Sequence, residues 1–219
     1  MRVLELFAGS RSVGKVAEAM GHEVCSVDIK PFDKIDLVSD CEFLTIDQLP
    51  FIPDVVWASP PCTTYSIAAI SHHRYTNGFA PKTDFAAKSD RMIMNVLKLI
   101  EGTGAIFYIE NPRGALRKMP FMRGLDRVTV WYCRYGDIRA KPTDIWSNNI
   151  RSLLNPEATW LPRPICFNGN ENCHHEAAPR GARTGTQGLK NNYERSKIPE
   201  QLCVEVLEAA QIKIENEKA

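Results

Sequence analysis

The chain has 219 residues, of which 44% are hydrophobic and 24% are charged, and its formal net charge is +1. These proportions are ordinary for a globular protein with a sizeable core, and they exclude a mostly disordered chain. The length predicts one domain with a small appendage. No apolar run approaches the roughly 18 residues of a membrane span, and the acidic Glu5 in the apolar start argues against a signal peptide. Seven scattered cysteines predict reduced thiols in a cytoplasm.

Strand-like and helix-like segments alternate along the chain. Short apolar runs predict strands at residues 2–7, 23–29, 54–58, 105–109, 128–132 and 143–146. Helical spacing of apolar residues predicts helices at residues 13–20 and 86–100, and a last helix that begins at Pro199. A polar stretch at residues 71–82 is expected to be a surface loop. Continuous apolar strands separated by helices predict a doubly wound, mostly parallel α/β sheet.

Residues able to bind a ligand follow the ends of the predicted strands, where open α/β sheets bind their ligands. Gly9 ends a Phe-Ala-Gly turn before a helix, and Asp28 follows 19 positions later. A glycine lets the backbone approach a ligand closely, and such an acidic residue accepts ribose hydroxyls, so the pair is typical of a cofactor site. The full G-x-G-x-x-G pattern is absent, so a plain strand-to-helix turn is the alternative.

A cysteine and a glutamate follow two further strands. Cys62 comes directly after Ser59, Pro60 and Pro61, and two prolines would hold its thiol at a set place. Because a thiolate is a nucleophile, this position suits a catalytic cysteine. The alternative interpretation of Cys62 is a structural cysteine buried in a turn. Glu110 precedes an Asn-Pro pair. In a closed pocket its carboxyl would stay protonated and donate to a ring nitrogen, although a helix-capping turn has the same pattern.

Together these motifs resemble those of the cytosine-5 DNA methyltransferases. Residues 5–9, 59–66 and 109–112 follow the order of the family's cofactor turn, Pro-Pro-Cys nucleophile motif and base-binding glutamate motif. Residues 193–202 resemble the family's last motif, which returns the C-terminal helix to the cofactor pocket. The resemblance covers most of the chain and implies a Rossmann-like methyltransferase fold.

The resemblance implies S-adenosylmethionine as cofactor and a cytosine base as substrate. The Cys62 thiolate would attack carbon 6 while Glu110 engages ring nitrogen 3, which makes carbon 5 able to accept the methyl group. The target base would have to be flipped out of a duplex or offered in a single strand. Lys141 and Arg139 complete the expected catalytic set. The residues expected to bind the cofactor are Phe7, Gly9, Asp28, Ile29, Glu42, Phe43, Ser59, Pro60 and Ser196. Asp40 or Asp47 is the alternative to Glu42.

The chain departs from the family pattern at two motifs. Ser10, Arg11 and Ser12 stand where the family has further glycines, so the cofactor turn must differ locally. Lys141 and Thr143 stand where the family has two arginines. Lys141 keeps a point charge but loses the planar fork of an arginine, and Thr143 loses the charge. Arg134 or Arg139 would then take over its role.

The family's target-recognition region is very short in this chain. The motifs divide the chain into a catalytic domain at 1–146, a small basic, loop-rich recognition lobe at 147–192 and a C-terminal helix at 193–219. So small a lobe predicts short or relaxed sequence specificity, or help from a partner. Basic stretches at 113–141 and 180–197 suggest a nucleic-acid groove, with Arg113, Arg180 and Arg183 on the phosphates, although solvated loops explain them equally well.

A cysteine and histidine cluster in the lobe raises the question of a metal. It consists of Cys166, Cys173, His174 and His175. Zinc sites pair two short-spaced clusters, whereas this stretch has one, so a loop packed near the base pocket is favoured and no metal is expected.

The sequence therefore predicts a DNA (cytosine-5)-methyltransferase that is a monomer and acts in the cytoplasm of a bacterial or phage-infected cell. An inactive, methyltransferase-like protein that binds nucleic acid is one alternative, motivated by Thr143 and the short lobe. An RNA cytosine-5 methyltransferase would use the same thiol chemistry. A nucleotide-dependent oxidoreductase is disfavoured by the missing G-x-G-x-x-G.

Overall fold

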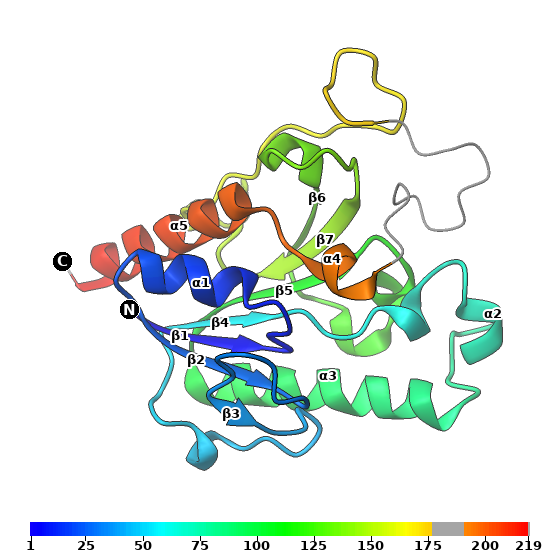
Figure 1. The fold of residues 1–219 in the computed structure, drawn as a ribbon, viewed down its shortest axis with the longest axis horizontal. Coiled ribbons are helices and arrows are strands. Elements are labelled where there is room, and N and C mark those ends of the chain that lie inside the picture. The colour runs from blue at the N-terminus through cyan, green and yellow to red at the C-terminus, as the bar shows by residue number, and fades with distance from the viewer. Residues whose placement is uncertain (177–190, 219) are drawn as a thin grey trace.

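The computed structural model describes residues 1–176 and 191–218, in which seven strands form one sheet of order β3-β2-β1-β4-β5-β7-β6 (Figure 1). The strands are β1 (Arg2–Leu6), β2 (Glu23–Asp28), β3 (Leu37–Val38), β4 (Val55–Ala58), β5 (Ile106–Pro112), β6 (Arg127–Trp131) and β7 (Pro142–Ser147). The first five are parallel, and β7 runs antiparallel to both β5 and β6. This arrangement confirms the predicted doubly wound, mostly parallel sheet.

Helices cover both faces of the sheet (Figure 1). On one face α1 (Ser12–Ala19) packs against α5 (Glu200–Lys218), and α3 (Asp84–Thr103) lies on the other. Thr83 caps the start of α3 by accepting a hydrogen bond from the Ala86 amide, and Gly104 ends it at φ 66°. The other helices are short: α2 (Ile70–His73), α4 (Asn192–Ser196) and the 3-10 helices η1 (Ile46–Gln48), η2 (Thr63–Tyr65), η3 (Ala115–Lys118), η4 (Pro120–Met122) and η5 (Tyr132–Tyr135). None of the described helices is long and apolar enough to cross a membrane.

Consecutive residues of the central strands enter two different cores. Leu4 and Val56 belong to the core under α3, whereas their neighbours Val3 and Trp57 belong to the core under α1 and α5. Because side chains alternate across a strand, a sheet with two covered faces needs apolar residues at every position. Each fully buried aliphatic side chain stabilises the fold by about 1.5–3 kcal/mol. These unbroken apolar runs are the signal from which the strands were predicted.

The predicted strands and helices agree with the structure to within a few residues at each end. β3 has two residues, too few to show a periodicity, and it was not predicted. The expected loop at 71–82 begins inside α2. In the described part of the recognition lobe, residues 148–176 form neither helix nor strand, as its loop-rich composition predicts. The three-part division of the chain stays a prediction.

A buried carboxyl organises the turn between β1 and α1. Glu5 is 2% exposed and accepts hydrogen bonds from the Val13 amide at 3.0 Å and the Ser26 hydroxyl at 3.1 Å. The buried Arg11 donates to the same hydroxyl at 3.0 Å and pairs with Glu18. Arg11 thus occupies the turn where the family has glycine, which is the local difference that the sequence predicts. Burial raises the pKa of Glu5 from 4.5 to about 7.

We expect the Glu5→Gln variant to change how stability depends on pH. Between the unfolded value of 4.5 and the folded pKa of about 7 the folded state binds more protons, so wild-type stability falls as pH rises through this window. Glutamine does not titrate, so the stability of wild type relative to Glu5→Gln should decline from about pH 5 to about pH 7 and then level off. Urea unfolding at a series of pH values measures this difference.

Glu18→Gln is the matched control. Arg11 lowers the pKa of Glu18, so this carboxyl stays ionised over the whole range and the stability difference should not change with pH. A pH-independent difference for Glu5→Gln would show that the buried carboxyl does not titrate in this window.

Candidate active site

The segment that leads to Cys62 is held by the neighbouring strands β1 and β5. Cys62 begins η2 directly after β4 and the Pro60-Pro61 pair. The Asn111 side chain of β5 donates to the Pro60 carbonyl at 2.9 Å, and the Ser59 amide donates to the Leu6 carbonyl of β1 at 3.3 Å. All seven cysteines lie in the described residues, and Cys62 is the exposed one. Its thiol therefore combines a fixed position with access for a substrate.

Glu110 lies near the end of β5, beside the strand that leads to Cys62. It is 5% exposed, and the Tyr132 hydroxyl donates to its Oε1 at 2.8 Å. The Lys141 Nζ lies 4.0 Å from the same oxygen. Burial and the charge of Glu110 raise the pKa of Tyr132 well above its ordinary value, so this phenol stays a donor. Oε1 is thus occupied by the protein, while no hydrogen bond to Oε2 is found within residues 1–176 and 191–218, so Oε2 can meet a substrate.

Lys141 brings a positive charge into the same buried site. Its Nζ donates to the Arg195 carbonyl at 3.1 Å and lies 4.4 Å from the centre of the Tyr132 ring. Burial lowers the pKa of Lys141, and Glu110 opposes that shift. Thr143, which stands where the family has arginine, donates its hydroxyl to the Lys141 carbonyl at 3.1 Å. Thr143 therefore holds the backbone of the lysine that carries the charge.

The neighbouring groups shift the pKa of the Cys62 thiol in both directions. Surrounding protein raises its pKa first, and the charge of Glu110 raises it further. The positive charges of Lys141 and Arg195 lower it. The structure thus brings Cys62, Glu110 and Lys141 together as the sequence predicts. Tyr132 and Arg195 were not predicted: Tyr132 was placed inside the expected strand 128–132, and only Ser196 was selected from the motif that contains Arg195.

Arg139 lies apart from this group. It forms an ion pair with Asp137, and its guanidinium donates to the carbonyls of Glu194, Arg195 and Lys197 at 3.3–3.4 Å. These contacts anchor residues 194–197, the segment that contains Ser196. Arg139 touches neither Cys62 nor Glu110 through any of these bonds, so its geometry is that of a positioning residue.

The turn after β1 wraps around Asp28 at the end of β2. Phe7 and Gly9 both have left-handed backbone, at φ 57° and 45°. The Gly9 amide donates to Asp28 Oδ2 at 3.0 Å, and the Lys30 amide donates to Oδ1 at 2.9 Å. Each carboxylate oxygen keeps a lone pair, so Asp28 can accept two further hydroxyls. Ile29, next in the chain, is 56% exposed and offers an apolar surface beside them.

The C-terminal motif returns to this turn. The Ile198 amide donates to the Ser12 hydroxyl at the start of α1, at 3.2 Å. Ser196 itself is exposed and donates to the Tyr193 carbonyl at 2.8 Å.

Glu42 faces α3 instead of the turn. Its carboxylate lies 2.6 Å from Arg91 Nε and 3.9 Å from Lys88 Nζ, and Phe43 beside it is 70% exposed. The Ser39 amide bonds the Asp28 carbonyl at 3.0 Å, so the residues directly after β3 are the ones beside Asp28. This geometry favours the alternative, Asp40, although Lys88 also contacts its carboxylate at 2.6 Å.

The predicted nucleic-acid groove is only partly described. Arg113 is exposed, with its guanidinium 5.5 Å from the centre of the Trp131 ring. Arg180 and Arg183 lie outside the described residues. Within the basic stretch 113–141, Arg117 and Arg127 both pair with the buried Asp144. The positive charge counted from the sequence is therefore partly neutralised inside the protein.

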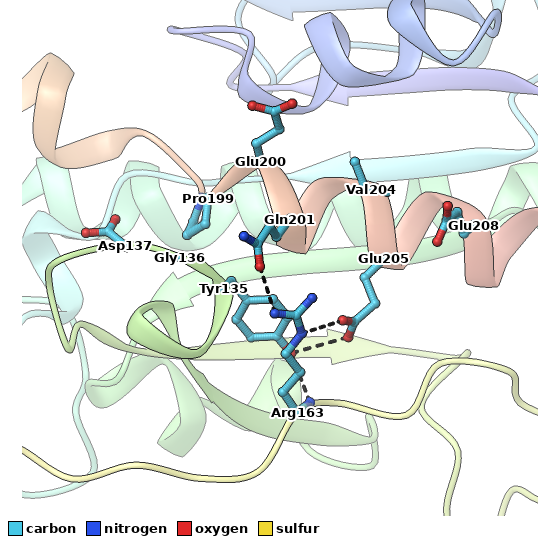
Figure 2. A pocket seen from close by; sticks show the side chains of 10 residues that line it. All are labelled: Tyr135, Gly136, Asp137, Arg163, Pro199, Glu200, Gln201, Val204, Glu205 and Glu208. Atoms are coloured by element: carbon cyan, nitrogen blue, oxygen red, sulfur yellow. Dashed lines mark hydrogen bonds and ion pairs between the residues drawn. The ribbon is translucent and has the colours of Figure 1, made fainter. Parts of the chain in front are cut away.

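A large pocket lies elsewhere, beside α5 (Figure 2). Its volume is about 680 Å³, and Arg163 contacts Glu205 and Gln201 there, each at 2.8 Å. It is lined by Tyr135, Gly136, Asp137, Arg163, Pro199, Glu200, Gln201, Val204, Glu205 and Glu208. None of these is a predicted site residue, and four acidic side chains make it a poor site for a phosphate chain.

The chain thus has a doubly wound α/β fold with an exposed cysteine just after the carboxyl end of β4. The chain is 27% identical, over 95% of its length and 99% of the relative, to a probable DNA (cytosine-5)-methyltransferase of Frog virus 3 (isolate Goorha). No family model matches the chain. The full-length similarity confirms the resemblance that the motifs predict. The relative comes from a virus of animals, so the similarity supports a viral setting but not the expected phage in particular.

A solved structure shows the same fold over about two thirds of this chain. The Entamoeba histolytica methyltransferase EhMeth is 13% identical, covers 67% of this chain and superposes with a TM-score of 0.51. The S. pombe Dnmt2 methyltransferase is 14% identical, covers 69% of the chain and has a TM-score of 0.46. The match spans 52% and 51% of those two chains, about half of each.

Two substitutions should move the Cys62 pKa in opposite directions. Lys141→Met removes a positive charge that lowers it, so the pKa should rise, and Glu110→Gln removes a negative charge that raises it, so the pKa should fall. Only the thiolate reacts with iodoacetamide, so the pH profile of alkylation at Cys62, followed by peptide mass spectrometry, reports the pKa.

Arg2→Gln, at an exposed surface pair remote from the sheet's carboxyl end, should leave the profile unchanged. Shifts in the same direction for both variants would contradict the arrangement. Thermal melting checks that each variant is folded.

Proposed function

We propose that this protein is an S-adenosylmethionine-dependent DNA (cytosine-5)-methyltransferase with Cys62 as its nucleophile. The observation that carries the proposal is the pairing of an exposed thiol with a buried carboxyl at the ends of adjacent strands β4 and β5. A reactive cysteine beside a carboxyl, a tyrosine donor and a lysine fits attack on a ring that must be polarised at the same time. The similarity to the viral relative supports the same reaction.

The turn around Asp28 fits the proposed cofactor. Phe7 and Gly9 give this turn a left-handed backbone, the free lone pairs of Asp28 suit two ribose hydroxyls, and Ile29 can cover an adenine face. When bound, S-adenosylmethionine supplies an electrophilic methyl group. Ser59 and Pro60 precede the nucleophile and would border the same space. The Ile198–Ser12 contact would close it from the C-terminal side.

The residues of the site divide the chemistry between them. The Cys62 thiolate forms a bond to carbon 6 of cytosine, and the electron pair of the 5,6 double bond becomes available at carbon 5 for the methyl group. Glu110 Oε2 bonds ring nitrogen 3 and shares with it the proton that the Cys62 thiol releases, while Tyr132 and Lys141 hold Oε1. A base then removes the proton from carbon 5, and the carbon–sulfur bond breaks to release Cys62.

The raised pKa of Cys62 means that the resting thiol is mostly neutral at pH 7. The thiol loses its proton before it attacks carbon 6, and the charges of Lys141 and Arg195 favour the thiolate.

DNA is the proposed substrate, because the viral relative is named for it. A flipped or unpaired cytosine is required to reach Cys62. The small lobe favours short recognition sequences, with Arg113 on the phosphate chain. We place the enzyme, as a monomer, in the cytoplasm of the host cell, where its free thiols are stable.

Covalent trapping tests the nucleophile. With S-adenosylmethionine and a duplex that contains 5-fluorocytosine, wild type should form a stable adduct, because fluorine cannot leave as a proton does. Cys62→Ser should form none, since a serine hydroxyl is far less acidic than a thiol, yet should still bind S-adenosylhomocysteine. Denaturing gel electrophoresis detects the adduct.

Cys25→Ala, in the buried core, is the matched control and should trap normally if folded. An RNA strand with the same base should trap poorly. Efficient trapping on RNA alone would replace the DNA assignment, and no trapping on either would favour an inactive binding protein.

Asp28→Ala tests the cofactor turn. Loss of hydrogen bonds to a charged group should weaken S-adenosylhomocysteine binding by about 1–3 kcal/mol, measured by calorimetry. Asp36→Ala removes a comparable carboxylate, which accepts from the Ser26 amide at 2.7 Å, and should leave affinity unchanged. Equal affinities of wild type and Asp28→Ala would mean that the end of β2 does not contact the ribose.

A further inference from the structure

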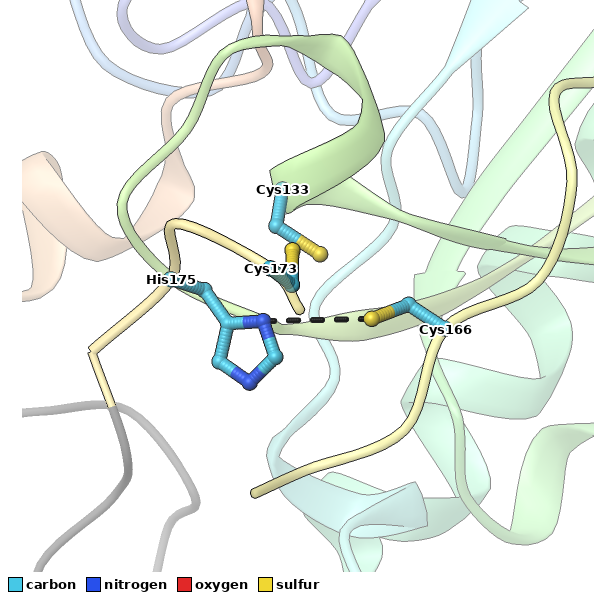
Figure 3. Close-up of side chains that lie close together, drawn as sticks. All are labelled: Cys133, Cys166, Cys173 and His175. Atoms are coloured by element: carbon cyan, nitrogen blue, oxygen red, sulfur yellow. Dashed lines mark hydrogen bonds between the residues drawn. The ribbon is translucent and has the colours of Figure 1, made fainter. Parts of the chain in front are cut away.

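Four side chains converge beside η5, at the edge of the recognition lobe (Figure 3). The sulfurs of Cys133, Cys166 and Cys173 and a ring nitrogen of His175 all lie within 4.8 Å of one another. Cys166 Sγ and His175 Nδ1 are 3.8 Å apart. All three cysteines are free thiols. His174, which the sequence counted in this cluster, instead contacts the Asp137 carbonyl, and Cys133 from a distant segment takes the fourth place.

The spacing of these atoms matches a tetrahedral metal site. With Zn–S bonds of about 2.3 Å and Zn–N bonds of about 2.0–2.1 Å, neighbouring ligand atoms lie about 3.5–3.8 Å apart. The Cys166–His175 separation is already at this value. Small rotations of the remaining side chains would bring all four ligand atoms around one ion. Three thiolates and one imidazole form a Cys₃His set, which zinc prefers over harder cations.

The end of the lobe that carries this cluster has little other apolar packing. The apolar cluster at this place consists of Trp131, Cys133, Ala140 and Cys166, with Cys173 packed against it. Trp160 anchors the first part of the lobe in the core under α1 and α5, whereas the apolar side chains that follow it, Leu161, Ile165 and Phe167, are 61–76% exposed. A small segment that cannot bury a hydrophobic core commonly depends on a metal or a disulfide.

We propose that Cys133, Cys166, Cys173 and His175 bind one structural zinc ion. Four protein ligands leave no open coordination position, so the ion has a structural role and no direct part in methyl transfer. It joins the lobe loop to η5, whose first residue, Tyr132, bonds Glu110. The sequence analysis expected no metal in this lobe. The proposal revises that expectation, because the fold brings Cys133 to the cluster as a further ligand.

Metal analysis of the purified full chain tests the site. Protein prepared without chelators and under reducing conditions should contain one equivalent of zinc by inductively coupled plasma mass spectrometry. Cys173→Ser and His175→Ala should lose most of it. His174→Ala is the matched control, because His174 is exposed and contacts the Asp137 carbonyl, and it should keep its zinc. Cys62→Ser should keep it as well, since that thiol lies outside the cluster.

A second measurement does not depend on whether the variants fold. Wild type grown with cobalt should show the intense visible bands of tetrahedral Co²⁺ and thiolate-to-cobalt charge transfer, and zinc should displace both. Metal-free soluble wild type, iron in place of zinc, a disulfide within the cluster, or zinc retained in both ligand variants would each overturn the proposal. Methyl transfer is not measured in either experiment, so the outcome is independent of the proposed function.

Discussion

The insertion of β7 between β5 and β6 is the constraint on which the active site depends. Because β7 runs antiparallel to β5, the residues that precede β7 lie at the carboxyl end of β5, where Glu110 is. The residues that follow β6 reach the same edge, since β6 is antiparallel to β7. Lys141 and Tyr132 are thereby delivered to one carboxylate oxygen. A parallel β7 would have placed Lys141 at the opposite edge of the sheet.

Sequence reasoning succeeded where a residue's place follows from its own strand. Gly9, Asp28, Cys62 and Glu110 come directly after or near the ends of apolar runs, and parallel strands bring such ends together. It did not single out Tyr132, because the apolar pattern placed that residue inside the strand 128–132, whereas β6 ends at Trp131 and Tyr132 begins η5. Cys133 was missed for a related reason: a metal ligand separated by a long stretch of chain leaves no spacing to recognise.

Departures from the family pattern are compensated by local contacts. Arg11 fills a turn where glycine is usual, and its buried charge is met by Glu18 and the Ser26 hydroxyl. Thr143 supplies no charge but bonds the Lys141 carbonyl. Similar contacts explain why counting basic residues in the sequence overestimates the charge available to a nucleic acid. A buried carboxylate such as Asp144 requires cations nearby, and Arg117 and Arg127 form ion pairs with it.

Residues on both sides of the segment 177–190 are tied to one short piece of backbone. The Glu176 amide bonds the Ile138 carbonyl at 2.9 Å, and Arg139, the next residue, bonds the carbonyls of Glu194, Arg195 and Lys197. The entropic cost of closing a loop rises only slowly with its length. Sequences of other lengths could therefore be grafted between these two anchor points while the anchors stay in register with the catalytic edge. Such an anchored insertion point would let this segment change in length and sequence, in evolution or in engineering, without moving Lys141, which is two residues from Arg139.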